Sequence, residues 1–222
     1  AQQDMIALSV CQSDPMAVPF GGSEPFFGTN PIAFAAPALD GKMFSLDMAT
    51  TVQAWGKVLV ARSKHEQIPL GWAVDKDGND TTESKDVHAL LPIAGPKGYG
   101  LMMMVDVLSG ALLGVPTGKN VSSMYHDLTE GRNLGQFHLV INPEMFVGLQ
   151  QFKENLSQVI DELHAVKPAS GFDQVYVPGE LGLKKQAEYE KDGIEIVDDI
   201  YEYLISDDLH FDRYHGKNRF SE

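Results

Sequence analysis

The stretch Gly95-Pro96-Lys97-Gly98-Tyr99-Gly100 runs directly into the apolar segment Leu101-Met102-Met103-Met104-Val105-Asp106-Val107-Leu108. Glycines let backbone N–H groups approach a ligand closely, and a helix that starts here would direct its positive end at an anion. Lys97 would add a mobile positive charge. The alternative is a tight turn that enters a buried helix, and this stretch taken alone favours the turn.

The composition is that of an acidic globular protein. Of 222 residues, 43% are hydrophobic and 22% are charged, and the formal net charge is −14. Nucleic acids and anionic membrane surfaces are bound by clustered Lys and Arg, so this charge argues against both partners. No apolar run approaches the roughly 20 residues of a membrane span, and residues 1–4 do not resemble the start of a signal peptide.

The first part of the chain is predicted to form short strands separated by turns. The Asp40-Gly41 pair is typical of a hairpin turn, and Thr50 or Thr51 is a candidate N-cap for a helix over 52–61. Strands and helices do not alternate regularly, so we expect an α/β fold with a mixed, largely antiparallel sheet and flanking helices. The predicted strands are Ile6–Val10, Ile32–Ala36, Met43–Asp47 and Phe137–Ile141, and a buried helix is predicted over 101–113.

After Asn142-Pro143 the pattern becomes helical. Apolar residues recur at helical spacing over 152–166 and again over 197–204. Between these segments, 184–191 is either a charged helix or a solvated connector. Residues 207–222 are polar and are expected to form a tail.

Three short polar segments are candidates for ligand binding, and each has a structural alternative. Asp47, in Asp47-Met48-Ala49-Thr50, follows a predicted strand and could accept hydrogen bonds from both hydroxyls of a ribose or cap the next helix. Ser13-Asp14-Pro15 could place the Ser13 hydroxyl on a phosphate or amide, with Asp14 orienting a catalytic histidine, or could form a turn. Pro178-Gly179-Glu180 could close over a ligand or only turn.

Several common site motifs are absent from the sequence. There is no G-x-G-x-x-G after a strand, Lys97 is not followed by the Ser or Thr of a Walker motif, and no G-x-S-x-G elbow is present. Cys11 is the only cysteine and the seven histidines form no i, i+4 pair, so no metal site is expected. No residue qualifies as a general base. A single cysteine also suits a reducing compartment, and we expect a cytoplasmic location.

Eight blocks follow one another along essentially the whole chain in a familiar order. They are Cys11–Pro15, Gly28–Pro37, Asp47–Thr51, Trp55–Lys57, Gly95–Leu113, Val121–Tyr125, Asn133–Gln136 and Gly193–Tyr201. Together they resemble the malate/L-lactate dehydrogenase-like family, whose nicotinamide-binding fold is not a Rossmann fold. The resemblance implies that fold for this chain.

The resemblance also implies an NAD-dependent dehydrogenase of small 2-hydroxyacids, in which a base takes the alcohol proton while hydride leaves carbon for the nicotinamide. By position, Ser13 would contact the cofactor and Asp14 would support the catalytic histidine. Asp47 would lie near the ribose 2′ position and favour NAD over NADP. The further cofactor contacts implied by position are Met48, Ala49, Lys97, Gly179, Glu180 and Leu181.

Members of the family carry an additional N-terminal region with the catalytic histidine, which would lie before Ala1. We therefore expect the full-length protein to be the enzyme, as a homodimer or higher homo-oligomer, and this chain alone to be inactive. Residues 1–145 would form the nicotinamide-cofactor-binding domain without its N-terminal part, and 146–222 a helical C-terminal region with a tail. The alternatives are another substrate within the family, namely malate, lactate, sulfolactate or a cyclic imine, or a non-catalytic nucleotide-binding or dimerisation module.

Overall fold

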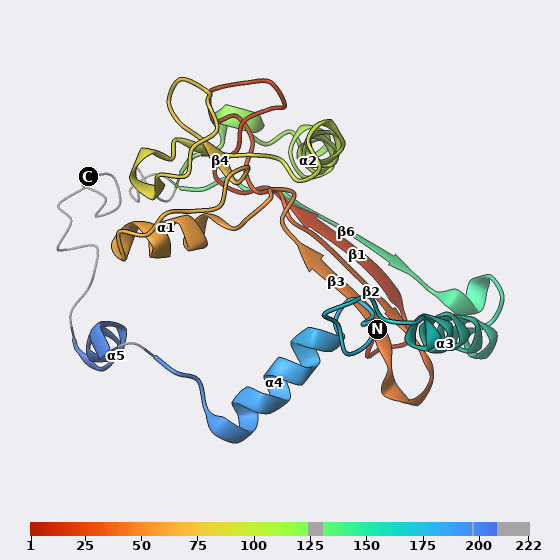
Figure 1. The fold of residues 1–222 in the computed structure, drawn as a ribbon. Helices are drawn as coiled ribbons and strands as arrows, with labels where there is room; N and C mark the ends of the chain where they lie inside the picture. The colour runs from red at the N-terminus through yellow and green to blue at the C-terminus, as the bar shows by residue number, and fades with distance from the viewer. Residues whose placement is uncertain (124–130, 197, 208–222) are drawn as a thin grey trace. The chain divides into compact units, whose positions relative to one another are not determined.

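The computed structural model describes residues 1–123, 131–196 and 198–207 (Figure 1). Met124 and Tyr125 of one sequence block, Val197 at the start of an expected helix, and the expected tail from residue 208 onward lie outside the described residues.

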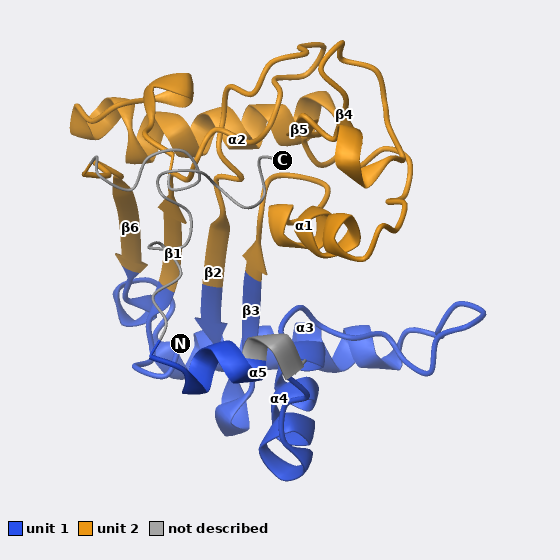
Figure 2. Cartoon of the chain, turned by 90° about the vertical axis from the view of Figure 1, so that its left-hand side faces the viewer, with its two compact units in different colours: residues 1–6, 35–46, 141–222 blue, residues 7–34, 47–140 orange. Residues whose placement is uncertain are grey.

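Within the described residues, the main sheet has four strands in the order β3–β2–β1–β6. Neighbouring strands run in opposite directions (Figure 2), so the sheet is antiparallel, and the expected mixed α/β fold is confirmed. Each strand is one residue longer than its predicted range. The strands are β1 (Ile6–Cys11), β2 (Ile32–Pro37), β3 (Met43–Met48) and β6 (Gln136–Ile141).

The predicted Asp40-Gly41 turn connects β2 to β3 through the short 3₁₀ turn η1 (Leu39–Gly41). Asp40 and Gly41 both have left-handed backbone conformations, with φ of 56° and 72°. Asp and Gly are favoured in such two-residue hairpin turns because both tolerate positive φ. The turn prediction is therefore confirmed, with its physical reason.

Packing divides the chain into two compact units, each assembled from separate stretches of sequence (Figure 2). Unit 1 contains residues 1–6, 35–46 and 141–222, and unit 2 contains residues 7–34 and 47–140. The assignment of residues 1–145 as a cofactor-binding domain and 146–222 as a helical region concerns function and stays a prediction.

Unit 2 contains the main apolar core. Val58, Leu90 and Met102 are fully buried in one cluster, and burying each such side chain contributes about 2 kcal/mol to stability. The elements of this unit, besides its parts of the main sheet, are α1 (Trp55–Ser63), β4 (Ala73–Val74), η2 (Ser84–Asp86), β5 (Ala89–Leu90), α2 (Pro96–Ser109), η3 (Ala111–Leu113) and η4 (Gly118–Asn120); β4 and β5 pair antiparallel.

The start of α1 corrects the predicted N-cap. The helix begins at Trp55, and its N-cap residue is Ala54 rather than Thr50 or Thr51. Thr50 is fully buried, and its hydroxyl donates to the Thr29 carbonyl at 2.9 Å. The Thr50 side chain is therefore used in a tertiary hydrogen bond, which local propensity does not reveal, and the Thr51 hydroxyl donates to the Gln53 carbonyl instead.

The helix expected over 101–113 is shorter at its C-terminal end and less buried than predicted. Helix α2 starts at Pro96, a residue suited to the first helical position, and ends at Ser109. Met102 and Val105 are fully buried, whereas Met103 and Val107 are 49% and 47% exposed. The helix therefore packs against the core with the face that carries Met102 and Val105, and its opposite face, with Met103 and Val107, is exposed.

Unit 1 contains the C-terminal helices and a small apolar cluster. Ala38, Ile160 and Val177 are buried there, with Phe44 and Leu156 packed against them. The two segments expected to be helical form α3 (Leu149–Ala165) and α5 (Asp198–Ile205), and residues 184–191, for which a helix and a connector were both open, belong to α4 (Glu180–Asp192). The short 3₁₀ turn η5 (Pro143–Met145) precedes α3. None of the described helices combines the length and apolar character needed to cross a membrane.

Candidate functional site

Unit 2 holds a cavity of about 340 Å³ that brings together three of the predicted site residues, Ser13, Asp14 and Ala49. The first two follow β1 directly, and Ala49 follows β3. The remaining wall comes from Met16 and Thr29, from the start of α1 and from the segment before β6. The residues that line the cavity are Ser13, Asp14, Met16, Thr29, Ala49, Ala54, Trp55, Gly56, Arg132 and Leu134.

The Ser13 hydroxyl is held by the Gly28-Thr29 turn. Its Oγ accepts the Thr29 N–H at 2.7 Å and lies 3.0 Å from the Thr29 hydroxyl. A Cβ at Gly28 would collide with Ser13 itself, so this close approach requires glycine. The Gly28-Thr29 block therefore has a structural reason: it fixes the position of Ser13.

Asp14 is a buried carboxylate with two described partners. Its side chain is 2% exposed, and the guanidinium of Arg132 forms an ion pair with Oδ1. The Ser123 hydroxyl donates to Oδ2 at 3.1 Å. A buried charge is strongly unfavourable without such partners. Asp14 is therefore more than a turn residue, because it is the centre of a charged network in the cavity.

Arg132 was missed by the sequence analysis, although it stands next to the Asn133–Gln136 block. Its segment is anchored by Gln12, which is buried: the Gln12 amide donates to Asp106 at 2.9 Å and accepts the Gly135 N–H at 3.2 Å. The Arg132 Nε is buried and has no hydrogen-bond partner among the described residues. The sequence feature that could have pointed to Arg132 is its position as a basic residue next to the Asn133–Gln136 block.

Asp47 does not cap a helix, because α1 begins only at Trp55. Its carboxylate is exposed and makes no hydrogen bond or ion pair with the described part of the chain. Met48 is half-buried beside Asp47, and neither residue lines the cavity.

The Cys11 thiol is disfavoured as a nucleophile at neutral pH. Its pKa is raised, first by burial and then by the charge of Asp47.

Lys97 is exposed at the second position of α2 and does not line the cavity. The glycines around it have unequal roles. Gly95 has φ of 58°, a conformation that other residues rarely adopt, and a Cβ at Gly98 would collide with the Ile93 carbonyl. Gly100 has open space around it. The tight turn into a helix is thus present, and a role for Lys97 in anion binding stays a prediction.

Gly179, Glu180 and Leu181 belong to unit 1, at the start of α4. Gly179 has φ of 102°, and a Cβ there would lie 2.9 Å from the Ser45 Cβ, so the turn packs tightly on β3. Partial burial alone would raise the pKa of Glu180, but hydrogen bonds from Val177 and His164, with the charges of His164 and Lys42, hold this pKa below its ordinary value. Leu181 is 58% exposed.

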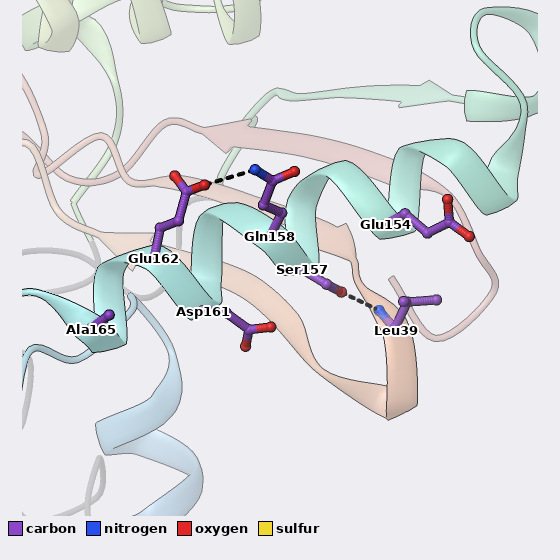
Figure 3. Close-up of a pocket in the computed structure, with 7 residues that line it drawn as sticks. All are labelled: Leu39, Glu154, Ser157, Gln158, Asp161, Glu162 and Ala165. Atoms are coloured by element: carbon purple, nitrogen blue, oxygen red, sulfur yellow. Dashed lines mark hydrogen bonds between the residues drawn. The ribbon is translucent and has the colours of Figure 1, made fainter.

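A second cavity, of about 510 Å³, lies along α3 in unit 1 (Figure 3). Its polar groups are largely used within the protein: Ser157 Oγ accepts the Leu39 N–H at 2.9 Å, and Gln158 donates to Glu162 at 2.7 Å. Its acidic rim is unsuited to an anionic nucleotide. The lining residues are Leu39, Glu154, Ser157, Gln158, Asp161, Glu162 and Ala165.

Neither a metal site nor a general base is found in the described part of the chain. No three His, Cys, Asp or Glu residues within it are grouped to hold a metal ion. The four histidines whose positions are described, namely His65, His88, His138 and His164, do not line the unit 2 cavity. His126, His210 and His215 lie outside the described residues.

The chain is similar to known dehydrogenases along most of its length. A family model described as malate/L-lactate dehydrogenase matches residues 1–205. The ureidoglycolate dehydrogenase (NAD(+)) of Escherichia coli (strain K12) is 60% identical over 222 residues, which cover all of this chain and 64% of that protein. The malate dehydrogenase of Pyrococcus horikoshii is 41% identical over 92% of this chain and 58% of its own length.

Solved structures agree with the sequence matches. The sulfolactate dehydrogenase of Methanocaldococcus jannaschii superposes with a TM-score of 0.82 at 40% identity, over 91% of this chain and 58% of that one. The chain thus spans less than two thirds of the length of these relatives.

Proposed function

Because the chain belongs to the malate/L-lactate dehydrogenase family, we propose that its protein is an NAD-dependent ureidoglycolate dehydrogenase, which oxidises (S)-ureidoglycolate to oxalurate in the breakdown of allantoin and purine nitrogen. The observation that carries the proposal is 60% identity over all 222 residues to the Escherichia coli enzyme of that name. The relatives named for malate and sulfolactate are about 20 percentage points less similar, at 41% and 40% identity.

The residues of unit 2 fit a nicotinamide dinucleotide. Asp47 offers an exposed carboxylate without a described partner, which suits two ribose hydroxyls. Lys97 stands at the positive end of α2, which suits a phosphate. The apolar groups of Ala49, Ala54 and Trp55 give the cavity a wall suited to a flat ring. When bound, NAD supplies the hydride acceptor.

Two residues of the unit 2 cavity would bind the cofactor and position the general base. We assign Ser13, fixed by Thr29, to a hydrogen bond with the cofactor. Asp14, ionised beside Arg132, would orient the imidazole of the general base, which removes the proton from the substrate hydroxyl as hydride leaves the carbinol carbon. No described residue is assigned as that base. The resemblance to the family also assigns nucleotide contacts to Gly179, Glu180 and Leu181, at the start of α4.

Two alternatives have specific support. A different 2-hydroxyacid or a cyclic imine as substrate is favoured by the relatives named for malate, sulfolactate and Δ1-pyrroline-2-carboxylate. A non-catalytic nucleotide-binding or dimerisation role is favoured by the absence of a described histidine from the cavity.

Steady-state kinetics separate these possibilities. The protein expressed from its complete reading frame is assayed with NAD and (S)-ureidoglycolate, malate, lactate or sulfolactate, and with a cyclic imine in the reductive direction. We expect the highest kcat/KM with ureidoglycolate. A higher kcat/KM with another substrate would contradict the specific proposal, and NAD binding without turnover of any of them would favour the non-catalytic role.

A further inference from the structure

His164 and Glu180 join the end of α3 to the start of α4. His164 lies in the last turn of α3, and its Nε2 is 2.9 Å and 3.0 Å from the two carboxylate oxygens of Glu180, the first residue of α4. The positive end of α4 favours the negative charge of Glu180. The start of α4 therefore stabilises the carboxylate that His164 contacts.

The same carboxylate closes the turn that precedes α4. Glu180 Oε2 accepts the Val177 N–H at 2.8 Å, and the Glu180 N–H donates back to the Val177 carbonyl at 3.1 Å. Val177 is 3% exposed and packs with Ile160 of α3. The next carbonyl, that of Pro178, accepts the Ser45 N–H at 3.1 Å. The position of the Glu180 carboxylate thus helps to set the shape of the turn over 177–181.

Lys42 is a further charged side chain that acts on Glu180, and its own ion-pair partner is Asp161. The Lys42 ammonium group lies 3.2 Å from the Asp161 carboxylate, and these side chains are 48% and 66% exposed. Among the described side chains, the direct hydrogen bond to the Glu180 carboxylate comes from His164. His164 is therefore the polar side chain of α3 that holds the Glu180 carboxylate, beside the apolar contact of Ile160 with Val177.

We propose that His164 is a positioning residue for the nucleotide: it holds the Glu180 carboxylate and so keeps the turn over 177–181 in the shape that binds NAD. The inference rests on the proposed function, because the contact of Gly179, Glu180 and Leu181 with NAD is itself proposed. His164 touches neither the reacting carbon nor its proton in this scheme. Its loss should therefore raise the KM for NAD and leave kcat at saturating NAD unchanged.

The test is a double-mutant cycle in the protein expressed from its complete reading frame. His164→Ala should raise the KM for NAD by about three- to tenfold. The effect is modest because the substitution removes one hydrogen bond to a carboxylate, between side chains that are about one third exposed. In a Glu180→Ala background, His164→Ala should have no further effect, because the group it positions is gone. His164→Gln, which keeps an N–H donor, should restore part of the affinity.

Gln158→Ala is the matched control, because Gln158 also makes a side-chain hydrogen bond on α3, to Glu162 rather than to Glu180. It should leave the KM for NAD unchanged. An unchanged KM in His164→Ala, or equal effects of that substitution with and without Glu180, would overturn the inference alone. Failure of the unsubstituted protein to bind NAD would instead overturn the proposed function and the inference with it.

Discussion

The guanidinium of Arg132 forms an ion pair with the carboxylate of Asp14, which is 2% exposed in the unit 2 cavity. The two residues lie far apart in the sequence and meet because Gln12 anchors the segment before β6. The pair places a buried carboxylate in the cavity, and Arg132 and Ser123 hold its two oxygens. The contribution of the ion pair can be measured as a change in the free energy of unfolding.

Arg132→Met should lower the free energy of unfolding by about 3 kcal/mol, because it removes a cationic partner of the buried Asp14 carboxylate. The measurement is urea unfolding at neutral pH. The double variant with Asp14→Asn should recover part of the loss, since the buried carboxylate charge is then absent. Equal free energies of unfolding for Arg132→Met and the unsubstituted protein would show that Arg132 does not stabilise the Asp14 carboxylate.

The glycines of the Gly95–Gly100 stretch should differ in their tolerance of alanine. Gly98→Ala should destabilise the protein by at least about 2 kcal/mol, because the new Cβ meets the Ile93 carbonyl. Gly100→Ala, with open space around it in α2, should stabilise the protein by about 0.5–1 kcal/mol. Thermal unfolding of the two variants checks this, and a loss of stability in both would refute the distinction.

Asp47→Ser should shift the cofactor preference towards NADP. A carboxylate near the ribose would repel a 2′-phosphate, and its removal should raise the ratio of kcat/KM with NADP to that with NAD by about tenfold. Glu24→Gln, an exposed charge of unit 2 outside the cavity lining, is the control and should leave the ratio unchanged. If Asp47→Ser behaves like this control, Asp47 has no role at the ribose.

Glu180→Gln should change the pH dependence of stability. Because the pKa of Glu180 is lowered in the folded protein, the folded state binds fewer protons, and the ionised group stabilises it at neutral pH. That stabilisation is fully present above the ordinary glutamate pKa and is lost as pH falls through the lowered value. Urea unfolding from about pH 7 to about pH 3 should show the two proteins converging in stability on acidification. A difference independent of pH would contradict the assignment.

The strands could be predicted from sequence because each is a short apolar run with local boundaries, such as Pro37 at the end of β2 and Asp40-Gly41 before β3. The N-cap of α1 could not be predicted, because the hydroxyl of the candidate Thr50 bonds to a carbonyl 21 positions away. The partners of Asp14 were hidden for the same reason: Ser123 lies 109 positions from it. Local pattern identified Ser13 and Asp14 as candidates, the family resemblance added Ala49, and tertiary contacts placed the three around one cavity with Arg132.

Hydride transfer from ureidoglycolate to NAD can be followed with an isotope label. The protein from the complete reading frame is incubated with NAD and (S)-ureidoglycolate carrying deuterium on the carbinol carbon, and both products are analysed by NMR and mass spectrometry. We expect oxalurate together with reduced cofactor that carries the deuterium on its nicotinamide ring. Oxalurate without deuterium in the cofactor, or no oxidation of ureidoglycolate under conditions where malate or lactate is oxidised, would contradict the proposed function.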